Sequence, residues 1–462
     1  MKEYIKINKN SDNNDYCNNE LDYSALKEND LYSWKHSLLE AGIHNHMHIG
    51  ICLKNDMHIM PVILALDEME CQMDFYNIYS LEYLLIKNYY NCNVMISDVQ
   101  IGFEVNVTEK VFSFMDTEFF IYIFTDNTYI NKSLKKSYVY FTSGTTSIPK
   151  AIFKSEETMV KEAQAVSEQT KITSDDKILC ITSCSHVYGQ VMGCIIPALT
   201  GCKVKYLSCF TPYNRVLREL KTKEYTVLLT IPPFYNEMCD NLISNNYGLN
   251  WMFCGGCFPS LKVLNSGLHI NYIYGTTETG ILTLQKYDDD YAISSVGKVI
   301  RGVNIILANK LDIESEYDVY QFHVKSKYNA YKCVTENCSM NYNEVIPLND
   351  YGYIDSHNNV FLMGRTDNII NVHGEKVSCA EIEDVIQSIE FVKEVKVIKS
   401  GETGDEYPIA YIVLRTHMDE NDAIKQIRNI CKNSIPLFKI PKKIIILKEL
   451  KKTAMGKILL NQ

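Results

Sequence analysis

In the segment Tyr138-Val-Tyr-Phe-Thr-Ser-Gly-Thr-Thr-Ser-Ile-Pro-Lys150, an apolar strand changes abruptly into a polar loop. Small residues around a glycine let backbone N–H groups approach an anion closely, and the closing lysine adds a positive charge. The segment therefore indicates a polyphosphate-binding loop, although an ordinary polar turn can have the same composition. It lacks the Gly-Lys-Ser/Thr ending of the common P-loop, so it is a different motif.

The composition is that of a globular protein. The chain has 462 residues, of which 46% are hydrophobic, and a net charge of −10. This acidic balance argues against a nucleic-acid partner bound through a broad basic surface. The 16 cysteines lie in apolar contexts, the first residues are polar, and no apolar run is long enough to span a membrane. We therefore expect a cytoplasmic protein with reduced cysteines, no nucleic-acid partner and no membrane span.

Strand and helix patterns alternate along the first part of the chain. Strands are predicted at residues 138–141, 178–181, 204–207, 227–230, 252–254 and 272–274, and a helix capped by Ser155 is predicted at residues 156–168. This alternation predicts an α/β fold whose large N-terminal domain, residues 1–364, has mostly parallel sheets covered by helices. In such folds, ligands lie beyond the C-terminal ends of the strands.

The pattern changes near residue 365. A helix is predicted at 380–389, strands at 392–398 and 410–414, a second helix at 423–432 and a last strand at 443–447. This order predicts a small α+β C-terminal domain, residues 365–462.

Candidate site residues lie in several further segments. In Tyr274-Gly-Thr-Thr-Glu-Thr-Gly280, the tyrosine can stack on a base and the glutamate can bind Mg²⁺. Gly255-Gly256 permits close backbone approach to an adenine, or is simply a tight strand exit. Asp350 can accept ribose hydroxyls and Arg365 can meet phosphate oxygens, unless the two form a surface salt bridge of little value.

The order and spacing of these motifs resemble those of the adenylate-forming superfamily: acyl- and aryl-CoA synthetases, peptide-synthetase adenylation domains and firefly luciferase. The resemblance covers nearly the whole chain. It rests on Phe141-Thr-Ser-Gly-Thr-Thr-Ser-Ile-Pro-Lys150, Tyr274-Gly-Thr-Thr-Glu278, Asp350, Gly364-Arg-Thr-Asp367, Gly374-Glu-Lys-Val-Ser-Cys-Ala-Glu-Ile-Glu383 and Thr453-Ala-Met-Gly-Lys457.

The resemblance implies an enzyme that uses ATP and Mg²⁺ to adenylate a carboxylic acid and then passes the acyl group to a thiol. It implies Mg²⁺ ligands at Thr142 and Glu278, and an α-phosphate contact at Thr277. It implies adenine beside Gly255, Gly256 and Tyr274, and ribose at Asp350 with Arg365 nearby. The remaining nucleotide-binding residues that it implies are Ser143, Gly144, Thr145, Thr146, Lys150, Gly275 and Thr276.

The resemblance also implies two roles for the C-terminal domain. Lys457 would bridge the substrate carboxylate and the nucleotide during adenylation. The domain would then rotate about a hinge at Asp367 and bring the loop that contains Gly374 to the site for thioester formation. His186 matches a position beside the acyl pocket, although a packed core histidine is the alternative.

The sequence departs from the family pattern at a few positions. Ser147 and Ala151 replace glycines of the phosphate loop, which we expect to stiffen it and to slow pyrophosphate release. Leu348-Asn349, Asn371 and Lys451 also differ from the common residues. None of these changes removes a reactive group, so we expect an active enzyme.

The leading prediction is an acyl-CoA ligase, because Ile369-Ile-Asn-Val-His-Gly-Glu-Lys-Val377 is most similar to CoA-ligase versions of this motif. One alternative is a stand-alone ligase that loads the phosphopantetheine of an acyl carrier protein. Another, of a different class, is a non-catalytic nucleotide-binding sensor. Aromatic, Met and Cys residues in segments 184–192, 232–235, 253–257 and 279–282 favour an apolar or aromatic acid as the substrate.

Overall fold

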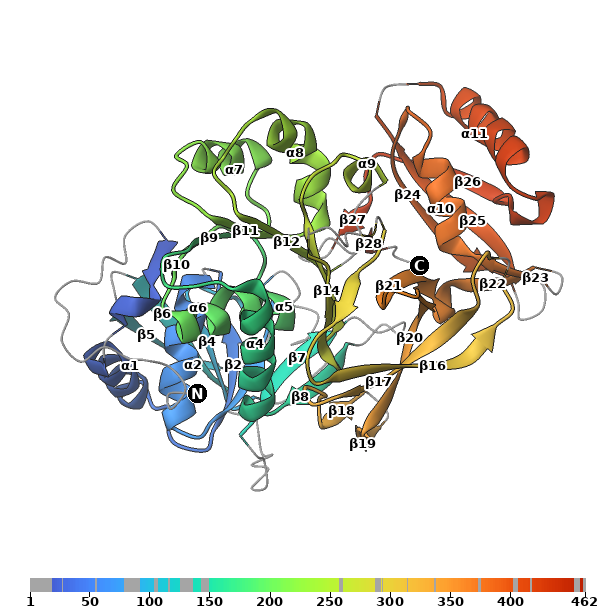
Figure 1. The fold of residues 1–462 in the computed structure, drawn as a ribbon. Helices are drawn as coiled ribbons and strands as arrows, with labels where there is room; N and C mark the ends of the chain where they lie inside the picture. The colour runs from blue at the N-terminus through green and yellow to red at the C-terminus, as the bar shows by residue number, and fades with distance from the viewer. Residues whose placement is uncertain are drawn as a thin grey trace.

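The computed structural model describes residues 19–459 with internal gaps. The gaps are residues 27, 55, 79–91, 104–106, 115–116, 125–135, 143–148, 257–260, 287–291, 293, 314, 336–337, 373–374, 402–405, 416–417 and 453–457. The described chain forms a large N-terminal part built on two sheets and a smaller C-terminal part beside it (Figure 1).

The larger sheet has 12 strands in the order β1-β10-β9-β11-β12-β13-β14-β15-β21-β20-β17-β16. Strands β10, β9, β11, β12 and β13 run parallel, and the pairs from β13 to β16 are antiparallel. The strands are β1 (Glu20–Asp22), β9 (Lys177–Cys180), β10 (Lys203–Tyr206), β11 (Val227–Thr230), β12 (Trp251–Gly255), β13 (Asn271–Thr276), β14 (Gly280–Leu284), β15 (Gly297–Val299), β16 (Val303–Leu311), β17 (Val319–Ser326), β20 (Val345–Ile354) and β21 (Asn359–Arg365).

The second sheet has nine strands in the order β19-β18-β8-β7-β3-β2-β4-β6-β5. Its central strands β7, β3, β2 and β4 are parallel, and antiparallel strands extend both edges. The strands are β2 (His48–Cys52), β3 (Gln72–Phe75), β4 (Val94–Ser97), β5 (Val107–Phe114), β6 (Thr117–Phe124), β7 (Tyr138–Thr142), β8 (Lys150–Lys154), β18 (Lys332–Val334) and β19 (Ser339–Asn341).

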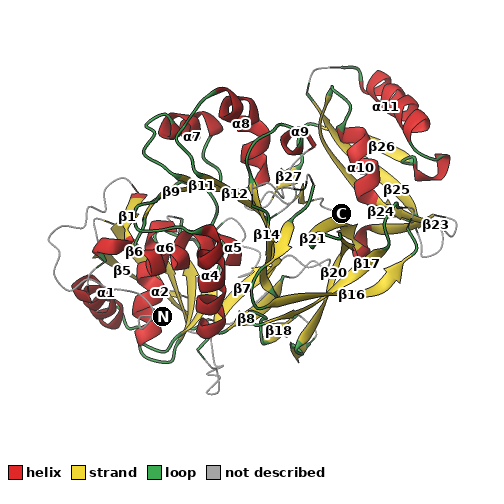
Figure 2. Cartoon of the chain, viewed as in Figure 1, coloured by secondary structure: helices red, strands yellow, loops and turns green. Residues whose placement is uncertain are grey.

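Helices separate the two sheets and cover the outer face of the larger one (Figure 2). Successive strand residues point to opposite faces, so Ile178 packs in the cluster between the sheets and Leu179 in the outer cluster. The inner cluster includes α2 (Ile59–Glu68), α4 (Glu156–Thr170) and α6 (Ile196–Thr200), and the outer cluster includes α7 (Tyr213–Leu220) and α8 (Pro232–Ser244). The other helices of this part are α1 (Glu28–Glu40), α5 (Val187–Gln190) and α9 (Leu261–Leu264), and a π-helical turn, Val191–Ile195, joins α5 to α6.

The cap predicted for the helix at residues 156–168 is present in the structure. Ser155 Oγ accepts the N–H of Thr158 at 3.2 Å, and Thr158 Oγ1 accepts the N–H of Ser155 at 3.1 Å. This reciprocal capping box satisfies two donors that a helix start would otherwise leave unpaired. It fixes where α4 begins, directly after β8.

The C-terminal part has its own apolar core, with Val377, Ile382, Val397 and Ile412 among its members. Tyr351 of β20 donates to Ser378 Oγ at 3.0 Å, which ties this part to the larger sheet. Its elements are β22 (Ile369–Val372), β23 (Glu375–Ser378), α10 (Cys379–Gln387), β24 (Val392–Ser400), β25 (Tyr407–Leu414), α11 (Glu420–Ser434), β26 (Lys443–Leu447), β27 (Lys451–Lys452) and β28 (Ile458–Leu459).

The predicted fold class is confirmed, and the strands at 227–230 and 443–447 have the predicted bounds. The sequence patterns did not predict the long antiparallel extension of both sheets. Strands such as β16 and β20 mix buried and exposed positions, so they lack the continuous apolar runs of the parallel strands. The domain boundary at residues 364 and 365, and movement about Asp367, stay predictions.

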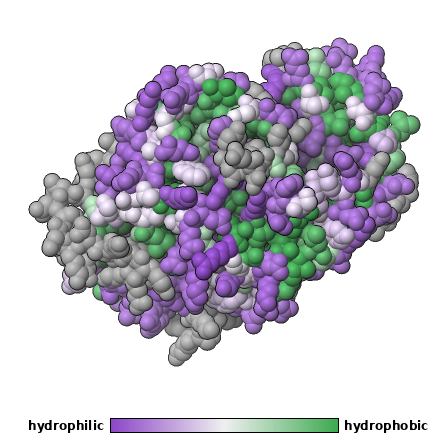
Figure 3. All heavy atoms as spheres, in the orientation of Figure 1, coloured by the Kyte–Doolittle hydropathy of each residue, from purple (hydrophilic) through white to green (hydrophobic). Residues whose placement is uncertain are grey.

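The surface is mixed in character. The face in Figure 3 is largely hydrophilic, with hydrophobic patches over the C-terminal part and near the β16–β17 ribbon. Exposed apolar side chains of that ribbon include Ile306, Leu307 and Tyr317. Among the described residues, no helix is both long and apolar enough to cross a membrane.

Candidate active site

Three predicted nucleotide-binding residues meet around the carboxylate of Asp350. Asp350 is only 8% exposed, and its Oδ2 accepts the hydroxyl hydrogen of Tyr274 at 2.8 Å. Arg365 Nη1 lies 3.4 Å from Asp350 Oδ1, because β20 and β21 pair in a register that places the two residues opposite each other. The salt bridge therefore joins the exposed guanidinium of Arg365 to a buried carboxylate that Tyr274 also holds, and it is not an isolated surface pair.

Burial sets the protonation of this group. Loss of solvation raises the pKa of Asp350, while the Arg365 guanidinium and the Tyr274 hydroxyl oppose that rise. Burial also raises the pKa of Tyr274 well above its ordinary value, so the phenol keeps its proton. A protonated phenol and a guanidinium thus both donate to one carboxylate, and the oriented carboxylate can accept hydroxyl groups.

Arg365 also holds the predicted hinge residue. Its Nε and Nη2 bind the two carboxylate oxygens of Asp367 at 3.0 and 2.8 Å. Asn349 Nδ2 lies 3.4 Å from Asp367 Oδ2. One guanidinium therefore connects the Asp350 group to the start of the C-terminal part, through a geometry that is bidentate on the Asp367 side.

The turn between β13 and β14 holds Thr277 and Glu278 at the C-terminal end of a parallel strand. Thr279 donates its N–H to Thr276 Oγ1 at 3.2 Å, and the Glu278 carbonyl accepts the N–H of Ala330 at 2.7 Å. A Cβ on Gly275 would lie 2.3 Å from the Gly280 carbonyl oxygen, so only glycine fits there. The Thr277 and Glu278 side chains are half-buried at the edge of the sheet.

The ends of the predicted phosphate loop are well defined. Thr142 is the last residue of β7 and Lys150 the first of β8, and the two are paired across the antiparallel ladder. The chain therefore reverses direction between Thr142 and Lys150, which the sequence patterns did not predict. Ser143, Gly144, Thr145 and Thr146 of this loop lie outside the described residues, as do Gly374 and Lys457.

The two glycines after β12 have different surroundings. A Cβ on Gly255 would lie 2.7 Å from the ring of Tyr188, so packing of this aromatic ring already requires glycine. Gly256 is exposed and has a φ of +98°, which favours glycine. The contact of Tyr188 with Gly255 was not predicted, because nothing in the sequence pairs this tyrosine with a glycine more than sixty positions away.

His186 lies at the start of α5, directly after a loop that follows β9. The imidazole is half-buried, and burial lowers its pKa to about 4. It is therefore neutral near pH 7, able to donate from one ring nitrogen and accept at the other.

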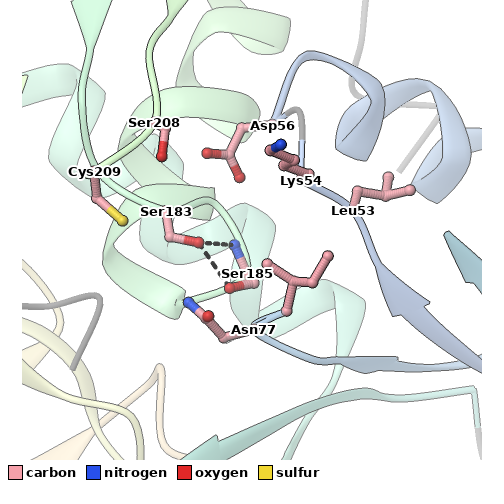
Figure 4. Close-up of a pocket in the computed structure, with 9 residues that line it drawn as sticks. Leu53, Lys54, Asp56, Asn77, Ser183, Ser185, Ser208 and Cys209 are labelled. Carbon is pink, nitrogen blue, oxygen red and sulfur yellow. Dashed lines mark hydrogen bonds between the residues drawn. The ribbon is translucent and has the colours of Figure 1, made fainter. Parts of the chain in front are cut away.

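A small polar cavity adjoins the loop that leads to His186. Figure 4 shows the Asp56 carboxylate pointing into it, with Ser183 hydrogen-bonded to Ser185. Asp56 Oδ1 accepts the N–H of Cys184 at 2.9 Å, and burial raises the pKa of Asp56 to about 7. Segments that follow β2, β3, β9 and β10 line the cavity, so strand ends of both sheets meet beside His186.

Two buried charged residues also lie beside the Glu278 turn. Lys154 ends β8, and Glu162 lies on α4 among the apolar positions Met159, Ala163 and Val166. A charged residue on the apolar face of an amphipathic helix is the sequence signal that could have found this pair.

Two parts of the chain match known families. Residues 125–316 match the family described as AMP-binding enzyme, and residues 381–457 match the AMP-binding enzyme C-terminal domain. The chain belongs to the AMP-binding enzymes. The predictions that it is a member of this superfamily and that it is an enzyme are confirmed.

Several CoA ligases are similar to this AMP-binding enzyme over much of its length. The 2-succinylbenzoate–CoA ligase of Listeria monocytogenes is 28% identical over 70% of this chain and 68% of its own. The medium-chain fatty-acid–CoA ligase of Escherichia coli is 23% identical over 73% of this chain and 63% of its own.

The fold is also shared with solved structures. The o-succinylbenzoate CoA synthetase of Bacillus subtilis, in complex with its acyl-adenylate, has a TM-score of 0.75 and 17% identity over 93% of this chain and 90% of its own. The same synthetase in complex with ATP and a magnesium ion has a TM-score of 0.72. The role of each site residue in the AMP-binding enzyme described here stays a prediction.

Proposed function

We propose that this AMP-binding enzyme adenylates a carboxylic acid with ATP and then transfers the acyl group to the thiol of CoA. A carboxylate oxygen bonds to the α-phosphorus, the bond to the β-phosphate breaks, and pyrophosphate leaves. The CoA sulfur then bonds to the acyl carbon, and AMP leaves. The observation that carries the proposal is the buried Tyr274–Asp350 pair, joined by Arg365, at the sheet edge that also holds Glu278.

The proposed nucleotide site fits the chemistry of its ligand. The Asp350 oxygens are held by Tyr274 and Arg365 and can accept ribose hydroxyls. Lys150, paired with Thr142, would meet the pyrophosphate end of ATP together with the loop between them. Thr277 would contact the α-phosphate. Catalysis at such a site consists of positioning and charge stabilisation.

Magnesium fits the oxygen donors of this site. Glu278 lies just after the end of β13 in the larger sheet, and Thr142 is the last residue of β7 in the second sheet. Mg²⁺ prefers carboxylate and hydroxyl oxygens to nitrogen or sulfur. When bound, Mg²⁺ neutralises charge on the phosphates. Thr142 and Glu278 would hold it, and Lys150 would hold phosphate oxygens independently of the metal.

The C-terminal part would supply Lys457 to the first half-reaction. The strands β27 and β28, which precede and follow this residue in the sequence, pair antiparallel. For the second half-reaction, rotation about Asp367 would replace Lys457 with the loop that contains Gly374.

The acid is proposed to be apolar or aromatic. The described residues of the four segments expected to line its pocket include the buried side chains of Met192, Phe234, Tyr235 and Phe253. The relatives are named for acids as different as 2-succinylbenzoate, which is aromatic and carries a second carboxylate, and a medium-chain fatty acid, which is aliphatic.

The test uses the purified full chain, [³²P]pyrophosphate and a panel of aromatic and aliphatic acids. We expect acid-dependent ATP–pyrophosphate exchange with some members and a CoA thioester when CoA is added. If exchange occurs without a CoA product, and the acyl group is transferred to a phosphopantetheinylated carrier protein, the acceptor is the carrier protein and not CoA. ATP binding without exchange on any acid would contradict the proposed reaction and favour a nucleotide sensor.

A further inference from the structure

Lys154 and Glu162 form an ion pair from which water is wholly excluded. Lys154 Nζ lies 2.9 Å from Glu162 Oε2, and both side chains are 0% exposed. Removing two charges from water is costly, and an apolar pair of similar volume often stabilises a fold equally well. A buried pair of this kind therefore suggests a task other than stability.

The second oxygen of Glu162 holds the backbone of the Glu278 turn. Glu162 Oε1 accepts the N–H of Ile281 at 2.8 Å. Gly280 has a φ of +76°, and a Cβ there would lie 2.5 Å from Glu162 Oε2. The carboxylate thus lies directly against Gly280 and Ile281, the first two residues of β14 after the turn that contains Glu278.

Lys154 connects this carboxylate to the phosphate loop. It is the last residue of β8, a strand of five residues that begins at Lys150. Both ends of β8 are paired with β7, through Thr142 with Lys150 and Tyr138 with Lys154. One ion pair therefore links the strand that follows the phosphate loop to the turn that carries Glu278.

We infer that Glu162, oriented by Lys154, is a positioning residue that aligns the Glu278 carboxylate with Thr142 and Lys150 around magnesium-bound ATP. This inference rests on the proposed function. Both side chains are wholly buried, so neither is placed to contact a nucleotide. Glu162 acts through the Gly280–Ile281 backbone, and Lys154 holds its carboxylate in place. Groups that support a metal ligand from behind typically change metal affinity when they are removed.

The experiment compares two double variants that differ only in the acceptor for the Ile281 N–H. Lys154→Met/Glu162→Gln removes both charges but keeps an amide oxygen that can accept from Ile281. Lys154→Met/Glu162→Leu removes the acceptor as well. The measurements are the thermal midpoint, the Mg²⁺ dependence of acid-dependent pyrophosphate exchange, and ATP binding by calorimetry with Mg²⁺ and with EDTA.

The leucine variant is expected to raise the Mg²⁺ concentration for half-maximal exchange by about tenfold, with ATP binding in EDTA unchanged. The glutamine variant is expected to stay within about threefold of the wild type, because the acceptor is retained. Lys136→Met is the matched control, since Lys136 binds Asp67 of α2 at 2.5 Å and Glu156, the first residue of α4, at 2.7 Å. Its Mg²⁺ dependence should equal that of the wild type.

Wild-type Mg²⁺ dependence in the folded leucine variant would overturn the inference, as would an equal shift in the Lys136→Met control. If the leucine variant does not fold, Gly280→Ala provides the same test, because its methyl group would displace the Glu162 carboxylate. A folded Gly280→Ala protein with unchanged Mg²⁺ dependence contradicts the inference equally. If no acid supports exchange in the wild type, the proposed function fails. The Mg²⁺ dependence of ATP binding in the wild type and the leucine variant then tests by itself whether Glu162 positions the Mg²⁺ site.

Discussion

At the scale of single residues, two buried carboxylates organise the site, and each accepts hydrogen bonds from two specific donors. Asp350 is held by a phenol and a guanidinium, and Glu162 by an ammonium and a backbone N–H. A buried carboxylate with fewer donors would be left with unsatisfied oxygens at a cost of about 1–3 kcal/mol each. The same donors also orient the carboxylates, so stability and geometry depend on one set of contacts.

Replacing Tyr274 by Phe removes the donor at 2.8 Å from Asp350 and keeps the ring. ATP affinity is expected to fall by about tenfold, as for loss of a hydrogen bond to a charged group. Because the hydroxyl lowers the pKa of Asp350, its removal raises that pKa further. ATP binding on acidification should therefore be lost at a higher pH than in the wild type. Tyr353→Phe, a ring on β20 that stacks on Phe361, is the control and should leave the profile unchanged.

His186 should make the fold sensitive to mild acid. Its pKa of about 4 lies below the 6.5 of an unfolded histidine, so the unfolded chain takes up the proton first. Stability from this residue is present above pH 6.5 and is lost as the pH falls towards 4. His186→Gln should lose less stability than the wild type between pH 7 and pH 5, by about 1–2 kcal/mol in denaturant unfolding. Equal losses in both proteins would show that the ring is not shielded.

At the scale of elements, the site lies where parallel strands end and the chain turns back. β7 and β13 each end in a loop of small residues and are followed by an antiparallel partner, β8 and β14. Lys150 therefore begins the second strand of a hairpin in one sheet, and Glu278 lies in the turn of a hairpin in the other. This arrangement changes the interpretation of the unusual loop residue Ala151, which is buried within β8 beside Val139 and Phe153.

Ser147→Gly and Ala151→Gly should have separate effects. Ala151 is in a strand, so glycine there removes a packed methyl group and lowers stability by about 1 kcal/mol without freeing the loop. Only Ser147→Gly is expected to raise turnover, if loop stiffness limits pyrophosphate release. Thermal midpoints and steady-state rates of the two single variants distinguish these effects, and a faster Ala151→Gly enzyme would contradict the assignment.

At the scale of the whole molecule, the Arg365 guanidinium links Asp350, in the proposed nucleotide site, to Asp367, the proposed hinge. It binds Asp350 on one side and both oxygens of Asp367 on the other. Tyr351 and Ser378 add a buried hydrogen bond between the two parts. Any rotation of the C-terminal part about Asp367 must therefore rearrange contacts that end at the Asp350 carboxylate.

Asp367→Pro and Lys457→Ala should impair opposite half-reactions. Proline fixes φ near −65°, so the hinge variant should keep acid-dependent exchange and lose thioester formation by about tenfold or more. Lys457→Ala should lose exchange yet form thioester from a chemically prepared acyl-adenylate. Single-turnover assays of each step check this, and a hinge variant with both activities intact would place the rotation elsewhere.

The local order of the chain was readable from its residues. Apolar runs located β7 and the parallel strands of the larger sheet, although not β2, β3 and β4. Ser155 located the start of α4, and the spacing of six motifs indicated the family that the comparisons confirm. These features depend on neighbours in sequence, through strand alternation, helix capping and the small residues of tight loops. The residues proposed for the nucleotide could be named for the same reason.

Tertiary structure alone decided which distant residues share a contact. The Tyr188 ring packs against Gly255 and leaves no room for a Cβ there. The Glu162 carboxylate contacts Gly280 and Ile281, and Arg365 binds both Asp350 and Asp367. Each contact depends on how strands are ordered in a sheet and which helix covers them, and no local pattern encodes that order. Burial also appears only in the folded chain, and with it the shifted pKa values of His186 and Asp350.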